Sequence, residues 1–107
     1  MNAFSYTRCD TSATPADVTR NFSERSAFLA GGTTLLDLAK LRVLQPGRLI
    51  DINRLQLDRI QELDTGGLRL GATVRNSVAA RDPRVRQRFP VLAEAILNGA
   101  SAQIRNM

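Results

Sequence analysis

Apolar residues in the first half of the chain form two short runs on either side of a helix-forming segment. The first run covers residues 27–30 and ends at two glycines, and the second covers residues 49–52 after a Pro-Gly pair. Residues 35–42, between them, are rich in Leu, Ala, Lys and Arg, which favour helices. Short apolar runs bounded by turn residues are typical of buried strands. The pattern therefore predicts a βαβ unit in which the two strands are parallel neighbours.

Two local signals indicate where helices begin in this half of the chain. Pro15 suits the first position of a helix, which predicts a short helix after it. Thr34 stands three residues before Asp37, a spacing that approximates a capping box. We therefore expect Thr34 to cap the helix of the βαβ unit.

The pattern changes after Asn53. Residues 59–63 and the alternating apolar residues of 68–74 flank a turn that contains Gly66 and Gly67. Such an arrangement is typical of an antiparallel hairpin. We therefore expect one structural unit over 1–53 and the beginning of another over 54–107.

The last third of the chain predicts short helices. Asn76 or Ser77 is expected to cap a helix that stops before Asp82-Pro83, and Pro90 opens a further helix that Gly99 ends. This further helix carries an apolar face made by Val91, Leu92, Ala95 and Ile96.

Composition limits the chemistry that the chain can perform. It has one cysteine and no histidine, which excludes an internal disulfide and disfavours a zinc site. One thiol cannot hold an iron–sulfur cluster, and the commonest general base is missing, so we expect any chemistry to belong to a cofactor. No apolar stretch reaches the roughly 18 residues needed to cross a bilayer. The N-terminus has neither the basic nor the apolar region of a signal peptide.

Positive charge is concentrated in one segment. Fifteen basic residues oppose ten acidic ones, for a net charge of +5, and four arginines fall within 81–88. A solvated surface helix is the simplest interpretation of this segment, and docking to an acidic protein face or to nucleic acid is the alternative. Nucleic acid is the less favoured partner, because Phe89 is the one aromatic residue beside these arginines.

The most specific motif is the loop 30–35 between the first predicted strand and the helix. Backbone N–H groups at a helix N-terminus are unpaired, and glycines let a phosphate approach them closely. The loop also lies at the carboxyl end of a parallel strand, where α/β folds place ligands. A phosphate site is one interpretation of the motif, and a plain tight turn is the other. The motif is neither a P-loop nor the alternating-glycine fingerprint of dinucleotide-binding folds.

Several segments resemble, in the same order, those of a known family. They are Phe4-x-Tyr6-x-Arg8, 29–38, 49–53, 67–72, 74–76 and 99–106. Together they resemble the FAD-binding, or medium, subunits of the molybdenum hydroxylases, which include xanthine dehydrogenase, aldehyde oxidoreductase and CO dehydrogenase. The likeness is strongest to the bacterial aldehyde oxidoreductase branch and runs almost from end to end.

The resemblance implies an α/β chain, α+β overall, with a PCMH-type FAD-binding fold. Residues 1–53 would form a small N-terminal βαβ subdomain, and residues 54–107 the start of a larger subdomain with antiparallel strands. It further implies a segment that wraps the FAD pyrophosphate: Phe28, Leu29, Ala30, Gly31, Gly32, Thr33, Thr34 and Leu35. In the family a second loop, of the type Thr-x-Gly-Gly-Asn, completes this site, and the chain ends just before that loop. We therefore expect the chain alone to be inactive and to hold FAD weakly.

The same resemblance implies an electron-transfer function with FAD as the cofactor. Substrate is oxidised at a molybdenum cofactor in one partner subunit, and electrons pass through [2Fe–2S] clusters in another to the FAD and then to an external acceptor. No residue of this chain is assigned a catalytic or metal-binding role. The expected location is the cytoplasm, or the periplasm by co-export with a partner, and no membrane is involved. The alternatives are a small basic module that binds nucleic acid or a protein, and a fragment with a structural role only.

Overall fold

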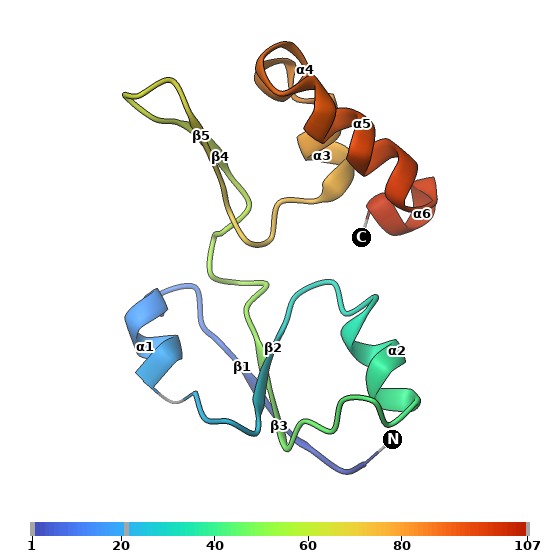
Figure 1. The fold of residues 1–107 in the computed structure, drawn as a ribbon. Coiled ribbons are helices and arrows are strands. Elements are labelled where there is room, and N and C mark those ends of the chain that lie inside the picture. The colour runs from blue at the N-terminus through green and yellow to red at the C-terminus, as the bar shows by residue number, and fades with distance from the viewer. Residues whose placement is uncertain (1, 21, 107) are drawn as a thin grey trace. The chain divides into compact units, whose positions relative to one another are not determined.

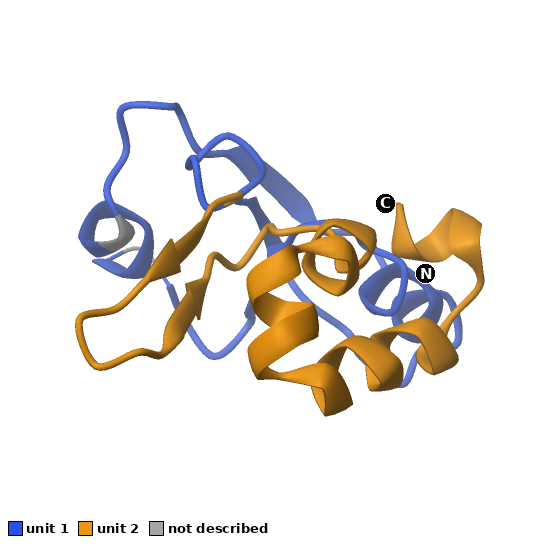
Figure 2. Ribbon diagram, turned by 90° about the horizontal axis from the view of Figure 1, so that it is seen from above, with its two compact units in different colours: residues 1–57 blue, residues 58–107 orange. Residues whose placement is uncertain are grey.

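The computed structural model describes residues 2–20 and 22–106 of the chain. These residues form two compact units, which comprise residues 1–57 and 58–107 and are coloured separately in Figure 2. Residues 54–57 lie in the first of these units.

Unit 1 is a three-stranded parallel sheet with two helices (Figure 1). Its elements are β1 (Ser5–Arg8), α1 (Pro15–Arg20), β2 (Ser26–Leu29), α2 (Leu35–Lys40) and β3 (Arg48–Asp51). The strand order is β1-β3-β2, and β2 and β3 pair in parallel with Phe28 opposite Ile50. The predicted βαβ unit is therefore confirmed, with each strand beginning one residue earlier than expected. Strand β1 was not predicted, because its four residues are all exposed and give no apolar signal.

The central strand β3 holds the core of unit 1 because both of its faces are covered. Leu49 and Ile50 are 3% and 2% exposed, and successive side chains of a strand point to opposite faces. On one face, Ile50 clusters with Val18 of α1 and with Ile52. On the other, Leu49 lies with Ala39 of α2. The two helices therefore flank the sheet on opposite sides, as Figure 1 shows.

Unit 2 is a hairpin followed by four helices. The elements are β4 (Ile60–Glu62), β5 (Leu68–Leu70), α3 (Asn76–Arg81), α4 (Pro83–Arg88), α5 (Pro90–Gly99) and α6 (Ala102–Arg105). β4 and β5 are antiparallel, which confirms the predicted hairpin. The buried apolar side chains of this unit come from the helices, and they are Ala79, Ala80, Val85 and Ala93.

The predicted capping box at Thr34 is wrong. Thr34 is the N-cap residue of α2, but its φ of −95° and ψ of −46° are helical and its side chain makes no capping hydrogen bond. A capping side chain needs extended backbone at that position. The reciprocal pair lies instead at α1, where Thr14 N donates to Asp17 Oδ2 at 2.9 Å and Asp17 N donates to Thr14 Oγ1 at 3.2 Å.

The predicted ends and faces of the later helices need further correction. Arg75, not Asn76 or Ser77, is the N-cap residue of α3. α5 begins at Pro90 and ends at Gly99 as predicted, but its buried residue is Ala93, which lies outside the predicted apolar face. Val91 on that face is 76% exposed, because α3 and α4 pack against a different side of the helix. α6 was not predicted.

Within residues 2–20 and 22–106, no helix is long and apolar enough to span a bilayer.

Candidate functional site

The loop that joins β2 to α2 lies at the carboxyl edge of the parallel sheet, and it contains the predicted phosphate motif. β2 ends at Leu29 and α2 begins at Leu35, so residues 30–34 form the connection. Gly32 has a φ of +78°, a left-handed conformation that side-chain-bearing residues rarely adopt. Gly31, Thr33 and Thr34 are exposed. The loop is therefore open to a ligand at the edge where α/β folds bind them.

The loop presents consecutive unpaired donors. Among the described residues, none accepts a hydrogen bond from the backbone N–H of Gly31, Gly32 or Thr33. Unpaired N–H groups that precede a helix form a favourable environment for an anion, because each can donate to a phosphate oxygen. These backbone N–H groups fit a phosphate group, and no basic side chain is needed to bind it.

Three carbonyl groups in or next to the same loop accept hydrogen bonds. Leu29 O accepts from Ile52 N at 3.0 Å, and Gly32 O accepts from Leu36 N at 3.0 Å. Ala30 O accepts from the side-chain Nδ2 of Asn53, also at 3.0 Å. These three acceptors are thus bound within unit 1, while the neighbouring N–H groups of Gly31, Gly32 and Thr33 have no acceptor among the described residues.

Asp51, the last residue of β3, lies at this same edge of the sheet and accepts hydrogen bonds from several groups. Its carboxylate accepts a hydrogen bond from Tyr6 Oη, and its Oδ1 accepts from Asn53 N at 2.9 Å and Asn53 Nδ2 at 2.8 Å. Burial by itself favours the neutral acid, but the hydrogen bonds from Tyr6 and Asn53 outweigh it and lower the pKa of Asp51. This network was not predicted from the sequence. Its signal was available, since polar Asp51 and Asn53 alternate with Ile52 at the end of a buried strand.

Two of the predicted site residues carry side chains that serve the fold. The ring of Phe28 stacks on that of Phe22, with centroids 4.8 Å apart and planes at 27°. Leu29 lies close to Gly32, where an added Cβ would meet Leu29 Cδ1 and Leu36 Cδ1 at 3.1 Å each. The structure thus brings residues 30–34 together as a backbone loop, while Phe28 and Leu29 pack against neighbouring residues of unit 1.

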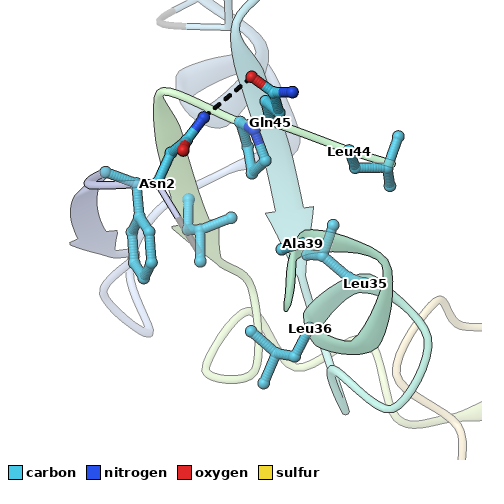
Figure 3. A pocket seen from close by; sticks show the side chains of 9 residues that line it. Asn2, Leu35, Leu36, Ala39, Leu44 and Gln45 are labelled. Carbon is cyan, nitrogen blue, oxygen red and sulfur yellow. Dashed lines mark hydrogen bonds between the residues drawn. The ribbon is translucent and has the colours of Figure 1, made fainter. Parts of the chain in front are cut away.

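A small hollow on the α2 side of the sheet is separate from the loop's free donors (Figure 3). It is lined by Asn2, Phe4, Leu35, Leu36, Ala39, Leu44, Gln45, Pro46 and Leu49. Asn2 Nδ2 donates to Gln45 Oε1 at 2.9 Å across its rim. Its volume of about 10 Å³ suits a single water molecule and is far too small for a nucleotide.

The arginine-rich segment lies on the surface of unit 2, as predicted. Arg81, Arg86 and Arg88 are exposed and Arg84 is half-buried. Two of the four arginines make contacts within their own unit: Arg84 pairs with Asp82 at 2.9 Å and Arg88 with Glu62 at 2.8 Å. Only part of the segment's charge is therefore free to bind a partner.

Comparison with known proteins gives one consistent family. Residues 2–107 match the family described as the FAD binding domain in molybdopterin dehydrogenase. The chain is 49% identical over 106 residues to the aldehyde oxidoreductase FAD-binding subunit PaoB of Escherichia coli, covering 99% of this chain and 33% of that protein. It is 44% identical over 80 residues to the carbon monoxide dehydrogenase medium chain of Hydrogenophaga pseudoflava, covering 74% of this chain and 28% of the relative.

Solved structures agree with the sequence relatives. Quinoline 2-oxidoreductase from Pseudomonas putida 86 superposes with a TM-score of 0.84 at 29% identity, over 98% of this chain and 36% of that one. The chain belongs to the family of FAD-binding domains of molybdopterin dehydrogenases, and its fold is of the PCMH type. It spans about a third of the length of the E. coli relative.

Proposed function

We propose that the loop 30–34 binds the pyrophosphate of FAD, within the longer segment Phe28–Leu35 that the family resemblance singled out. The observation that carries the proposal is the run of N–H groups at Gly31, Gly32 and Thr33, which have no acceptor in the described part of the chain and lie at the carboxyl edge of a parallel sheet. It is supported by membership of a family of FAD-binding domains. We also propose that units 1 and 2 correspond to the small subdomain and the start of the larger subdomain of that fold.

Each part of the loop has a separate role in this proposal. The N–H groups of Gly31, Gly32 and Thr33 donate to phosphate oxygens, and the exposed Thr33 and Thr34 hydroxyls can add donors. The glycines keep side-chain atoms away from the approaching phosphate. The bound flavin supplies the redox chemistry, and the protein supplies binding, orientation and electrostatics.

The larger assembly is also part of the proposal. We propose that the chain forms part of a medium subunit that carries electrons to an external acceptor in an aldehyde oxidoreductase-like enzyme. Substrate oxidation then takes place at a molybdenum cofactor in one partner subunit, and a second partner carries [2Fe–2S] clusters. Support comes from relatives named as FAD-binding subunits and medium chains of such dehydrogenases. The proposed location is the cytoplasm, or the periplasm with an exported partner, and cell fractionation tests it.

A chimera tests the FAD site directly. In it, this chain replaces the matching third of the E. coli PaoB subunit. We expect the chimera to retain FAD after purification, and Gly31→Asp to remove most of it by placing a negative charge against the pyrophosphate. Gly99→Asp is the matched control, because a Cβ at Gly99 has no atom within 4 Å. A folded Gly31→Asp chimera with full flavin content would show that the loop is only a turn.

The alternative function, a basic module for nucleic acid or an acidic protein, has weaker support. Arg84 and Arg88 already pair with Asp82 and Glu62 within unit 2. A real nucleic-acid binder loses affinity steeply with salt, so a flat salt dependence of any binding to DNA would exclude it.

A further inference from the structure

We infer that Asn53 is a positioning residue. It orients the backbone N–H of Gly31, the first of the three N–H groups in the loop 30–34 that we propose bind FAD. This inference rests on the proposed FAD site and assigns a role to a residue outside the loop. Asn53 follows β3 by two positions, and its side-chain amide lies between the buried carboxylate of Asp51 and the backbone of the loop.

The geometry requires a group with two donors. Asn53 Nδ2 lies 2.8 Å from Asp51 Oδ1 and 3.0 Å from Ala30 O. Both partners are acceptors, and a primary amide carries one N–H for each. A hydroxyl has one donor and a carboxylate has none, so Ser, Thr or Asp at this position cannot make both contacts.

The acceptor on the sheet side is itself fixed. Asp51 is only 8% exposed as a residue, and its carboxylate also accepts from Tyr6 Oη on β1 and from Asn53 N. The amide of Asn53 is thus held on one side by a carboxylate anchored to the sheet. The second N–H of the Asn53 amide is then free to bind the carbonyl of Ala30 in the loop.

Holding the Ala30 carbonyl also determines the direction of the next N–H. The peptide unit is planar, so the carbonyl of Ala30 and the N–H of Gly31 point in opposite directions from one rigid plane. The preceding carbonyl, Leu29 O, is held by Ile52 N at 3.0 Å, so the chain enters this plane from a fixed position. Asn53 therefore keeps the Gly31 N–H turned away from the group that binds its carbonyl, free for a phosphate oxygen.

Hydrogen exchange of the 107-residue chain tests the inference without FAD. Leu36 N donates to Gly32 O, so exchange of the Leu36 amide reports on the loop. We expect Asn53→Asp and Asn53→Ala to speed this exchange roughly tenfold, the equivalent of one lost hydrogen bond. The β3 amides should be unaffected. Asn76→Asp, the same chemical change at an exposed position of unit 2, is the matched control.

Flavin content of the PaoB chimera is the second readout. Asn53→Asp and Asn53→Ala should lower FAD retention while leaving the melting temperature of the chimera close to that of the parent. Unchanged Leu36 exchange in both variants would overturn the inference, and so would equal acceleration across β3, which would make Asn53 a residue of the fold. Faster loop exchange with full FAD retention would also overturn it. A parent chimera without FAD would refute the proposed function, and the exchange experiment would still decide whether Asn53 holds the loop.

Discussion

Arg88 on α4 connects its helix to the hairpin of the same unit, because its guanidinium donates to the carboxylate of Glu62 at 2.8 Å. The same side chain donates to the carbonyl of Gly66, at the turn of the hairpin, at 2.9 Å. Arg88 therefore contacts both one strand and the turn, although the simplest interpretation of its segment was a solvated surface helix.

We predict that this pair contributes little stability and that salt weakens it. The side chains of Arg88 and Glu62 are 37% and 56% exposed, and exposed pairs contribute less than about 1 kcal/mol. A double-mutant cycle of Arg88→Ala and Glu62→Ala, measured by urea unfolding at low and high salt, should give a coupling in this range that falls as salt rises. Arg88→Ala should cost more than Glu62→Ala, since it also loses the bond to Gly66. Equal costs would indicate that the Gly66 contact is unimportant.

Asp82 should make unit 2 sensitive to acid. The carboxylate of Asp82 accepts hydrogen bonds from the Arg84 side chain and from Arg84 N, and these bonds, the side-chain ones above all, lower the pKa of Asp82 to about 2 from an ordinary value of 3.8. A lowered pKa contributes stability above the ordinary value, and this contribution is lost as the pH falls from about 4 towards 2. Asp82→Ala removes it, so the difference in stability between parent and variant should shrink over that window. Asp82→Asn, which keeps an acceptor for the N-cap, should lie between the two.

Much of unit 1 could be predicted from the sequence because its signals are local. The apolar runs and the glycine turn were enough for β2, α2 and β3, since a βαβ unit needs little else. β1 could not be seen, because Ser5, Tyr6, Thr7 and Arg8 are all exposed and the strand is held by pairing with the distant β3. Pairing between strands more than 40 residues apart cannot be predicted from the local pattern of apolar and polar residues.

The candidate loop was predictable, but the contact that Asn53 makes with it was not. The glycine pair between a strand and a helix was visible in the sequence. The contact from Asn53 to Ala30 spans 23 positions and depends on the register of β2 against β3. The capping box failed for a related reason: Thr34 has the right spacing but helical backbone, which only the structure shows.

Tyr6→Phe should destabilise unit 1 and raise the pH at which it unfolds in acid. The hydroxyl of Tyr6 donates to the buried Asp51, and its loss should cost about 1 kcal/mol, since Tyr6 is half-exposed. Without that donor, burial acts on Asp51 with less opposition, so the pKa of Asp51 rises towards its ordinary value. The stability that ionised Asp51 contributes to unit 1 is present above the pKa of Asp51 in the unfolded chain. As the pH falls, Tyr6→Phe therefore loses this stability at a higher pH than the parent does. Urea unfolding of the parent, Tyr6→Phe and Asp51→Asn across the acid range measures this. An identical acid profile for Tyr6→Phe and the parent would contradict it.

Gly32→Ala and Gly66→Ala separate backbone strain from crowding. Both glycines are left-handed, with φ of +78° and +87°. Each alanine should therefore cost about 1–2 kcal/mol through strain alone. A Cβ at Gly66 has no atom within 4 Å, whereas one at Gly32 would meet Leu29 and Leu36 at 3.1 Å. Gly32→Ala should consequently destabilise its unit more than Gly66→Ala destabilises the other, as hydrogen exchange of each unit would show. Because Gly32 is required by the fold itself, loss of flavin in a Gly32 variant is weaker evidence for a phosphate contact than loss in Gly31→Asp.

The 107-residue chain by itself should bind FAD weakly. The chain spans about a third of the length of the E. coli relative named as an FAD-binding subunit. Its candidate site is one exposed loop whose donors are backbone N–H groups, and water competes for a phosphate bound there. Binding must also offset the lost freedom of the ligand, roughly 4 kcal/mol or more. A titration followed by flavin fluorescence should therefore show no saturation at micromolar chain concentrations. The PaoB chimera, measured in the same way, should saturate. Tight binding by the chain alone would mean that residues 30–34 and the Asn53 contact supply most of the site, and Asn53→Ala should then weaken that binding in the isolated chain as well.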